Sequence, residues 1–210
     1  MITPAPTELA GFTHHWIPRA GATRTLLLLH GTGGNETDLL SLGEMLDPSA
    51  NLLSPRGQVL EHGMPRFFRR LAEGVFDLED LRVRTDALAA FIAAASTTYG
   101  FAIDALVAVG FSNGANIAAS VMLQRPTALR AGIFLRAMVP FEPAVVPDLA
   151  SHRALLLSST TDPIVSVAHP ERLAALLRQG GAGVTLEWVP GGHQLTRADL
   201  TNVQQWLARP

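Results

Sequence analysis

The chain has 210 residues, of which 48% are hydrophobic and only 16% are charged, and its formal net charge is -2. A chain of this length buries roughly 70% of its unfolded surface, so we expect one domain over residues 1–210 that folds without disulfides or metal. The weak charge excludes a broad basic surface for nucleic acid, and the apolar content excludes disorder. Cysteine and lysine are absent, which excludes thiolate nucleophiles, thiolate metal sites and Schiff-base chemistry.

The N-terminal segment, Met1 to Gly11, has neither a basic region nor an apolar stretch, so we predict no secretory signal and a cytoplasmic location. The longest strongly apolar run, Leu26 to Leu29, is far shorter than the roughly 20 residues of a membrane span. We therefore expect no membrane partner.

Short apolar segments alternate with longer amphipathic segments, a pattern typical of parallel strands joined by crossover helices. The sequence therefore predicts the α/β class, with a mostly parallel central sheet flanked by helices. In chain order we expect strand Phe12–Pro18, strand Thr25–His30, helix Thr37–Leu46, strand Asn51–Ser54, helix Leu78–Thr98, strand Ala105–Phe111, helix Asn113–Gln124, strand Ala131–Met138, strand Ala154–Ser158, helix Glu171–Arg178, strand Val184–Val189 and helix Ala198–Leu207.

Two connections between these elements differ in length. Residues 55–77 form a long stretch rich in Arg, Gly and Pro, which we expect to be irregular and to shape a pocket, because long loops are often functional. Only about fifteen residues separate the strand that ends near Met138 from the strand that begins near Ala154, so no cap domain is predicted.

Residues Gly110 to Ala115, Gly-Phe-Ser-Asn-Gly-Ala, follow a predicted strand and precede a predicted helix. This context indicates a nucleophile elbow, in which Ser112 is exposed on a tight turn that needs small residues at Gly110 and Gly114. A passive serine in a glycine-rich turn is the alternative.

A serine nucleophile needs a base, and three histidines follow Ser112. His193 follows a strand through a flexible Pro-Gly-Gly turn and is the predicted base. His152 precedes a strand, at the wrong edge of the sheet, and His169 opens a helix.

The base needs a carboxylate to orient it. Asp162 lies shortly after the strand at 154–158, on a turn stiffened by Pro163, and is the predicted acid. Glu142 also follows a strand and remains an alternative. The chain order Ser112, Asp162, His193 is that of the α/β-hydrolase triad.

An oxyanion hole requires two backbone N–H groups. We expect one from Asn113, directly after the nucleophile, and one from Thr32 in the glycine-rich turn that follows an earlier strand. His30 is expected to hold this turn by hydrogen bonds rather than to act in catalysis.

Four segments together resemble the phospholipase/carboxylesterase family of α/β-hydrolases, and the likeness covers nearly the whole chain. They are Leu-His-Gly-Thr-Gly-Gly at 29–34, Gly-Phe-Ser-Asn-Gly-Ala at 110–115, Thr-Asp-Pro-Ile-Val at 161–165 and Gly-His-Gln-Leu-Thr at 192–196. Met-Pro-Arg-Phe-Phe-Arg at 64–69 is similar to a segment of small bacterial esterases described as hydroquinone-linked hydrolases. The resemblance implies ester or thioester hydrolysis by a Ser-Asp-His triad without metal or organic cofactor. Relatives of the dienelactone-hydrolase type carry cysteine at the elbow, which this chain lacks.

The expected partner is a small-molecule ester, and Phe68, Arg69 and Gln194 are predicted to contact it. The alternative for the Arg-Phe-Phe-Arg-Arg segment at 66–70 is that its phenylalanines anchor the loop while its arginines remain in water. No spacing typical of a metal site occurs. A thioesterase or acyltransferase with the same triad, a ligand-binding module on a hydrolase scaffold, and a homodimer all stay open.

Overall fold

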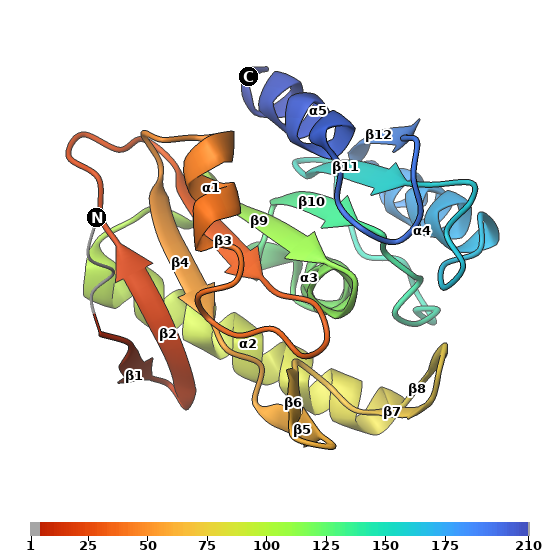
Figure 1. Ribbon diagram of the computed structural model, residues 1–210, viewed down its shortest axis with the longest axis horizontal. Helices are drawn as coiled ribbons and strands as arrows, with labels where there is room; N and C mark the ends of the chain where they lie inside the picture. The colour runs from red at the N-terminus through yellow and green to blue at the C-terminus, as the bar shows by residue number, and fades with distance from the viewer. Residues whose placement is uncertain (1–4, 210) are drawn as a thin grey trace.

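The computed structural model describes residues 5–209, and its centre is a twisted sheet of eight strands (Figure 1). The first three strands in sheet order pair antiparallel, and all later neighbours pair parallel, so the mostly parallel sheet is as predicted. In sheet order the strands are β1 (Thr7–Leu9), β2 (Phe12–Ile17), β4 (Asn51–Pro55), β3 (Thr25–Leu29), β9 (Leu106–Phe111), β10 (Ala131–Leu135), β11 (Arg153–Ser158) and β12 (Gly183–Trp188).

Alternate residues of the central strands point to opposite faces of the sheet, as the pleat requires. In β3, Leu27 and Leu29 belong to one apolar core and Leu26 and Leu28 to the other. The first core is covered by α2 (Leu78–Tyr99), α3 (Asn113–Gln124) and α4 (Ala168–Gln179), and the second by α1 (Leu40–Leu46) and α5 (Arg197–Leu207).

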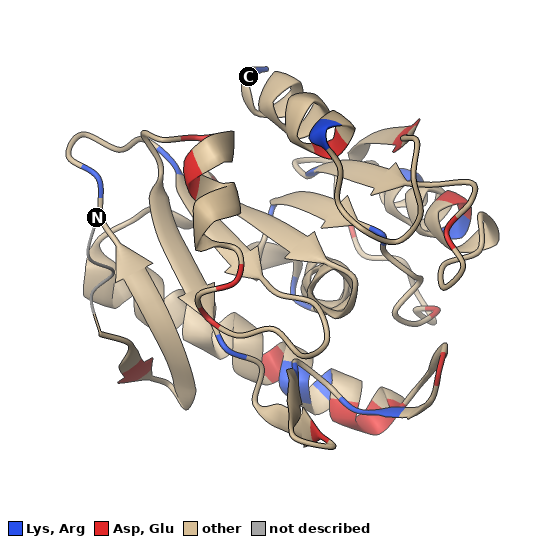
Figure 2. Ribbon diagram, in the orientation of Figure 1, with Lys and Arg blue, Asp and Glu red and all other residues tan. Residues whose placement is uncertain are grey.

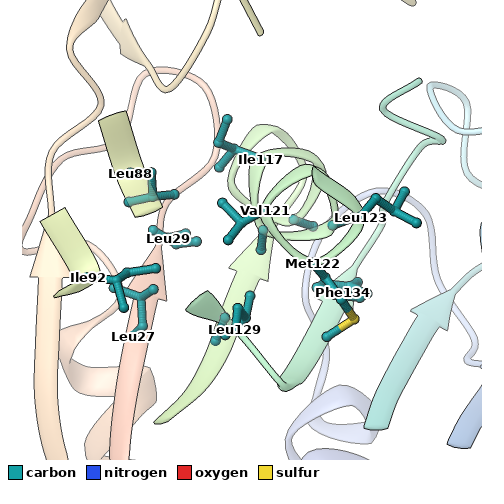
Figure 3. Close-up of a cluster of buried hydrophobic side chains, with 14 of the residues drawn as sticks. Leu27, Leu29, Leu88, Ile92, Ile117, Val121, Met122, Leu123, Leu129 and Phe134 are labelled. Atoms are coloured by element: carbon teal, nitrogen blue, oxygen red, sulfur yellow. The ribbon is translucent and has the colours of Figure 1, made fainter. Parts of the chain in front are cut away.

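Figure 3 shows the centre of the first core, where side chains of α2 and α3 meet β3. Leu88 and Ile92 of α2 and Val121 of α3 lie over Leu27 and Leu29. Because the central strands are buried on both faces, their sequences are continuous runs of apolar residues.

The clearest predicted helix, α2, begins at Leu78 as predicted and ends at Tyr99, one residue later than predicted. The Asp77 side chain accepts a hydrogen bond from the N–H of Asp80 at 3.1 Å, which caps the N-terminus. Gly100 takes a left-handed φ of 74° and ends the helix. Two short 3₁₀ turns, η1 (Ile103–Ala105) and η2 (Pro126–Ala128), precede β9 and β10.

Two expectations, for the end of one strand and for the long connection, need correction, and strand β1 was not predicted. The strand expected to run to Met138 ends at Leu135, because Arg136 has a φ of 56° and leaves the extended conformation. The segment at 55–77 is not irregular: it forms two antiparallel hairpins outside the main sheet, β5 (Val59–Glu61) with β6 (Met64–Arg66) and β7 (Arg70–Ala72) with β8 (Val75–Phe76).

Among the helices formed by residues 5–209, none combines the length and hydropathy that a membrane span requires.

Candidate active site

Ser112 lies on a tight turn between β9 and α3, with a φ of 52° and a ψ of -113°. The turn is possible only with glycines beside it. A Cβ on Gly110 would lie 2.6 Å from the Ala115 Cα, and one on Gly114 would lie 2.0 Å from the Leu29 carbonyl oxygen. The turn holds a residue other than glycine in a sparsely populated conformation, which is the strained geometry of a nucleophile elbow.

The side chains of Ser112, His193 and Asp162 form a continuous hydrogen-bonded chain. His193 Nε2 lies 3.0 Å from Ser112 Oγ, and His193 Nδ1 lies 2.8 Å from Asp162 Oδ2. The three residues come from segments after β9, β11 and β12, and the carboxyl ends of these parallel strands meet at one edge of the sheet (Figure 1).

The surroundings of Asp162 favour its charged form. The side chain is 1% exposed, and burial by itself would raise the pKa of this carboxyl. Hydrogen bonds from the N–H groups of Ile164, at 2.8 Å, and Val165, at 3.0 Å, together with His193, outweigh burial and lower the pKa below its ordinary value. A charged Asp162 accepts a hydrogen bond from Nδ1–H of His193, which keeps the proton on Nδ1 and leaves the Nε2 atom that faces Ser112 free to accept a proton.

The alternative bases and acid lie elsewhere. His152 precedes β11 and its Nε2 lies 2.8 Å from the Pro126 carbonyl oxygen. His169 lies in the first turn of α4. Glu142 is exposed and forms a two-point ion pair with Arg172. The structure brings none of the three into contact with Ser112.

Arg136, which was not predicted as a site residue, holds the segment that carries His193. Its guanidinium is fully buried and donates to the carbonyl oxygens of Gly192 and Gln194, each at 3.0 Å, on either side of His193. It also forms a two-point ion pair with the buried Asp199, at 2.7 and 3.0 Å. An arginine at the end of an apolar strand is a signal of a buried ion pair, but its partner 63 residues later was not identifiable.

The N–H groups of Thr32 and Asn113 have no acceptor within residues 5–209, and both residues line the same cavity as Ser112. Their segments are hydrogen-bonded to strand β6 and to the residue that follows it. The Gly33 N–H donates to the Pro65 carbonyl oxygen at 2.9 Å, and the Asn113 side-chain oxygen accepts from the Phe67 N–H at 2.8 Å. Two fixed and unpaired donors beside a serine hydroxyl suit the oxygen of a carbonyl under attack.

His30 holds the turn that carries Thr32, as expected. Its Nε2 accepts from the Gly57 N–H at 2.9 Å, and its Nδ1 donates to the Gly31 carbonyl oxygen at 2.7 Å. Burial lowers the pKa of His30, and these two partners require the neutral ring.

The cavity beside Ser112 has a volume of about 380 Å³, near the lower end of the roughly 300–1,000 Å³ typical of small-molecule sites. Its remaining lining includes residues of the two hairpins: Arg66, Arg70, Glu73, Gly74 and Phe76.

The three residues expected to contact substrate are not among those that line the cavity. Phe68 is fully buried and packs edge-on against Phe76, with ring centroids 5.1 Å apart, so it anchors the loop. Arg69 is exposed and pairs with Asp77 at 2.8 Å, outside the cavity. Gln194 is exposed, and the contact the structure gives it is the bond of its carbonyl oxygen to Arg136.

In residues 5–209, no three His, Asp or Glu side chains gather in a way that could hold a metal ion.

The chain is similar to known proteins both in sequence and in structure. Residues 16–209 match the sequence profile of the Phospholipase/Carboxylesterase family. The candidate hydrolase MhqD of Bacillus subtilis (strain 168) is 46% identical over 192 residues, which are 91% of this chain and 96% of that protein.

Two solved structures are similar over nearly their full length. The Bacillus cereus carboxylesterase has a TM-score of 0.90 and 45% identity, covering 93% of this chain and 92% of that one. The Mesorhizobium loti carboxylesterase has a TM-score of 0.93 and 32% identity, covering 99% of both. The chain therefore belongs to the phospholipase/carboxylesterase family, and it is a carboxylesterase-type hydrolase with the α/β-hydrolase fold.

Proposed function

We propose that this hydrolase cleaves small carboxylic esters through an acyl-serine intermediate formed on Ser112. The observation that supports the proposal most is the hydrogen-bonded chain from Asp162 through His193 to Ser112, which ends in a cavity with two unpaired N–H donors.

In the first step Ser112 Oγ attacks the ester carbonyl carbon and His193 Nε2 takes the hydroxyl proton. The bond from the acyl carbon to the alcohol oxygen then breaks, and His193 returns the proton to the departing alcohol. Water attacks the acyl-serine in the same way, releasing the carboxylic acid and restoring the Ser112 hydroxyl. Asp162 orients His193 and stabilises its imidazolium form, and the N–H groups of Thr32 and Asn113 bind the oxyanion of each tetrahedral intermediate.

The test is steady-state hydrolysis of short acyl esters by the Ser112→Ala variant. Because the nucleophile is lost while the fold is kept, we expect kcat to fall by about 10⁴- to 10⁶-fold, with His193→Ala giving a loss of similar size. A fluorophosphonate probe should label the original protein and leave Ser112→Ala unlabelled. Ser49→Ala removes an exposed hydroxyl outside the cavity and serves as the matched control. Near-normal ester turnover by pure Ser112→Ala protein would contradict the proposal.

Thioester cleavage and acyl transfer to an alcohol would use the same acyl-serine intermediate. The substrate panel therefore pairs each oxygen ester with its thioester and adds an alcohol acceptor. A larger kcat/KM for the thioester, or transfer to the alcohol in preference to water, would replace ester hydrolysis as the main reaction.

A further inference from the structure

Two arginines line the wall of the cavity that contains Ser112 and His193. Arg66 ends β6 and its side chain is only 4% exposed, whereas Arg70 begins β7 and its side chain is 30% exposed. A guanidinium buried beside Ser112 is costly to desolvate, so its charge must be balanced by partners in the protein or by a bound anion.

One carboxylate, Glu61, lies between the two guanidiniums. Its two oxygens lie 3.3 Å from Arg66 Nη1 and 2.9 Å from Arg70 Nε. The trio therefore retains one net positive charge, and Figure 2 shows basic and acidic segments gathered along β5 to β8. Burial and the charge of Arg70 lower the pKa of Arg66, which means that the two like charges act on each other. A bound anion would relieve this repulsion.

The donors of the two arginines are only partly used. Arg66 Nε donates to the Phe68 carbonyl oxygen at 3.2 Å and Nη1 to Thr32 Oγ1 at 2.6 Å, and Arg70 Nε donates to Glu61. Within residues 5–209, Arg66 Nη2 and both terminal nitrogens of Arg70 have no acceptor. Oriented guanidinium groups with unused donors are suited to binding a carboxylate.

We propose that Arg66 and Arg70 bind a carboxylate group carried by the ester substrate, so that the enzyme prefers short esters that bear a negative charge. This inference rests on the proposed function. The cavity of about 380 Å³ limits the distance between the carboxylate and the reacting carbonyl, which favours half-esters of short dicarboxylic acids and esters of short hydroxy acids. Glu73 is the acidic residue among the described residues that line the cavity, and it lies on the exposed β7–β8 turn. The guanidinium of Arg66, in contrast, is buried in the cavity wall.

The test uses pairs of substrates that differ only in charge. Monomethyl succinate is compared with methyl succinamate, and acetoxyacetate with acetoxyacetamide, which places the carboxylate on the acyl side or the alcohol side of the ester. The quantity measured is the ratio of kcat/KM for the anionic member to that for the neutral member. We expect the original protein to favour the anionic member in at least one pair, through a lower KM.

Arg70→Gln should lower this ratio by about 10- to 100-fold in the preferred pair, because a charge-assisted interaction is lost. Arg70→Lys should retain part of the preference. Arg69→Gln removes the neighbouring charge, which points outside the cavity, and Arg82→Gln removes an exposed charge on α2; both should change the ratio by less than about 2-fold. Thermal unfolding of each variant checks that the fold is kept.

A binding measurement separates this inference from the proposed function. In the Ser112→Ala background, which does not consume substrate, calorimetric titration should show that Arg70→Gln weakens binding of monomethyl succinate or acetoxyacetate, whichever belongs to the preferred pair, by about 10-fold or more. Equal losses on charged and neutral esters, or an unchanged ratio in both pairs, would overturn the carboxylate site while leaving ester hydrolysis intact. Absence of turnover with every ester would contradict the proposed function instead.

Discussion

At the scale of single residues, the elbow depends on two glycines for different steric reasons. Gly110 avoids the start of α3, whereas Gly114 lets α3 approach the end of β3, with the nearest contact to the Leu29 carbonyl oxygen. Neither glycine has a positive φ, so both positions demand the absence of a side chain and not the left-handed backbone that glycine also permits.

We expect Gly114→Ala to destabilise the fold by about 3 kcal/mol or more, because the added Cβ would lie 2.0 Å from backbone that cannot move away without shifting β3. The measurement is chemical unfolding followed by circular dichroism. Gly183→Ala is the matched control, since the nearest atom to its Cβ is 3.8 Å away, and it should change stability by less than about 1 kcal/mol. Equal effects of the two substitutions would contradict this steric explanation.

At the scale of elements, the segments after β10 and β12 are joined through the buried pair of Arg136 and Asp199. Asp199 also accepts from the N–H and hydroxyl groups of Thr196 and so caps α5. One ion pair therefore fixes both the start of the last helix and the position of His193.

Arg136→Met should cost about 3–5 kcal/mol of unfolding free energy, because it leaves the Asp199 carboxylate buried without its partner. The double variant Arg136→Met with Asp199→Asn no longer has the unpaired buried carboxylate and should recover much of this stability. If Arg136 positions His193, kcat should stay about 10- to 100-fold low in the double variant, since stability returns but the bonds to Gly192 and Gln194 do not. Recovery of kcat together with stability would show a purely structural role.

The sequence predicted the long elements because their apolar periodicity reflects burial against one sheet. It also predicted that Ser112, Asp162 and His193 follow strands at one edge, which is where the structure has them. The hairpin strands have only two or three residues each, which is too short to show an alternation of apolar and polar side chains. The inward-facing residues of 55–77 could therefore not be identified from the sequence. Arg69 was expected at the pocket, whereas Arg66 and Arg70 line it. Arg66 ends β6 and Arg70 begins β7, while Arg69 lies between the two strands and pairs with Asp77, an arrangement that depends on strand bounds the sequence did not reveal.

At the scale of the whole molecule, stability is expected to depend on pH through two buried histidines, His15 and His30, and the half-buried His169. Burial lowers the pKa of His30, and also those of His15 and His169, from the ordinary value of 6.5. The unfolded chain therefore binds protons at a higher pH than the folded chain does. The stability contributed by the neutral rings is present above pH 6.5 and is lost as the pH falls toward the folded pKa values.

We expect the free energy of unfolding to decrease between about pH 7.5 and 5.5, with His30 contributing at most about 1.4 kcal/mol per pH unit. His30→Gln should flatten this dependence, since glutamine does not titrate. Asp162, whose pKa is lowered, acts in a separate window, because its contribution is lost only as the pH falls below about 4. Urea unfolding at a series of pH values provides the measurement, and parallel pH profiles for the two proteins would exclude a role for His30.

The two hairpins of residues 59–76 supply one wall of the cavity without belonging to the eight-stranded sheet. Ser112, Asp162 and His193, in contrast, follow the ends of the parallel strands β9, β11 and β12 of that sheet. The hydrogen bonds that join this segment to Gly33 and Asn113 use the backbone of Pro65 and Phe67, so on the proposed function we expect that hairpin side chains can be changed, and the substrates with them, while the backbone bonds beside Ser112 are kept. If the proposed function holds, the substrate range of this chain can be redirected through a short surface segment, with the capacity to hydrolyse an ester retained.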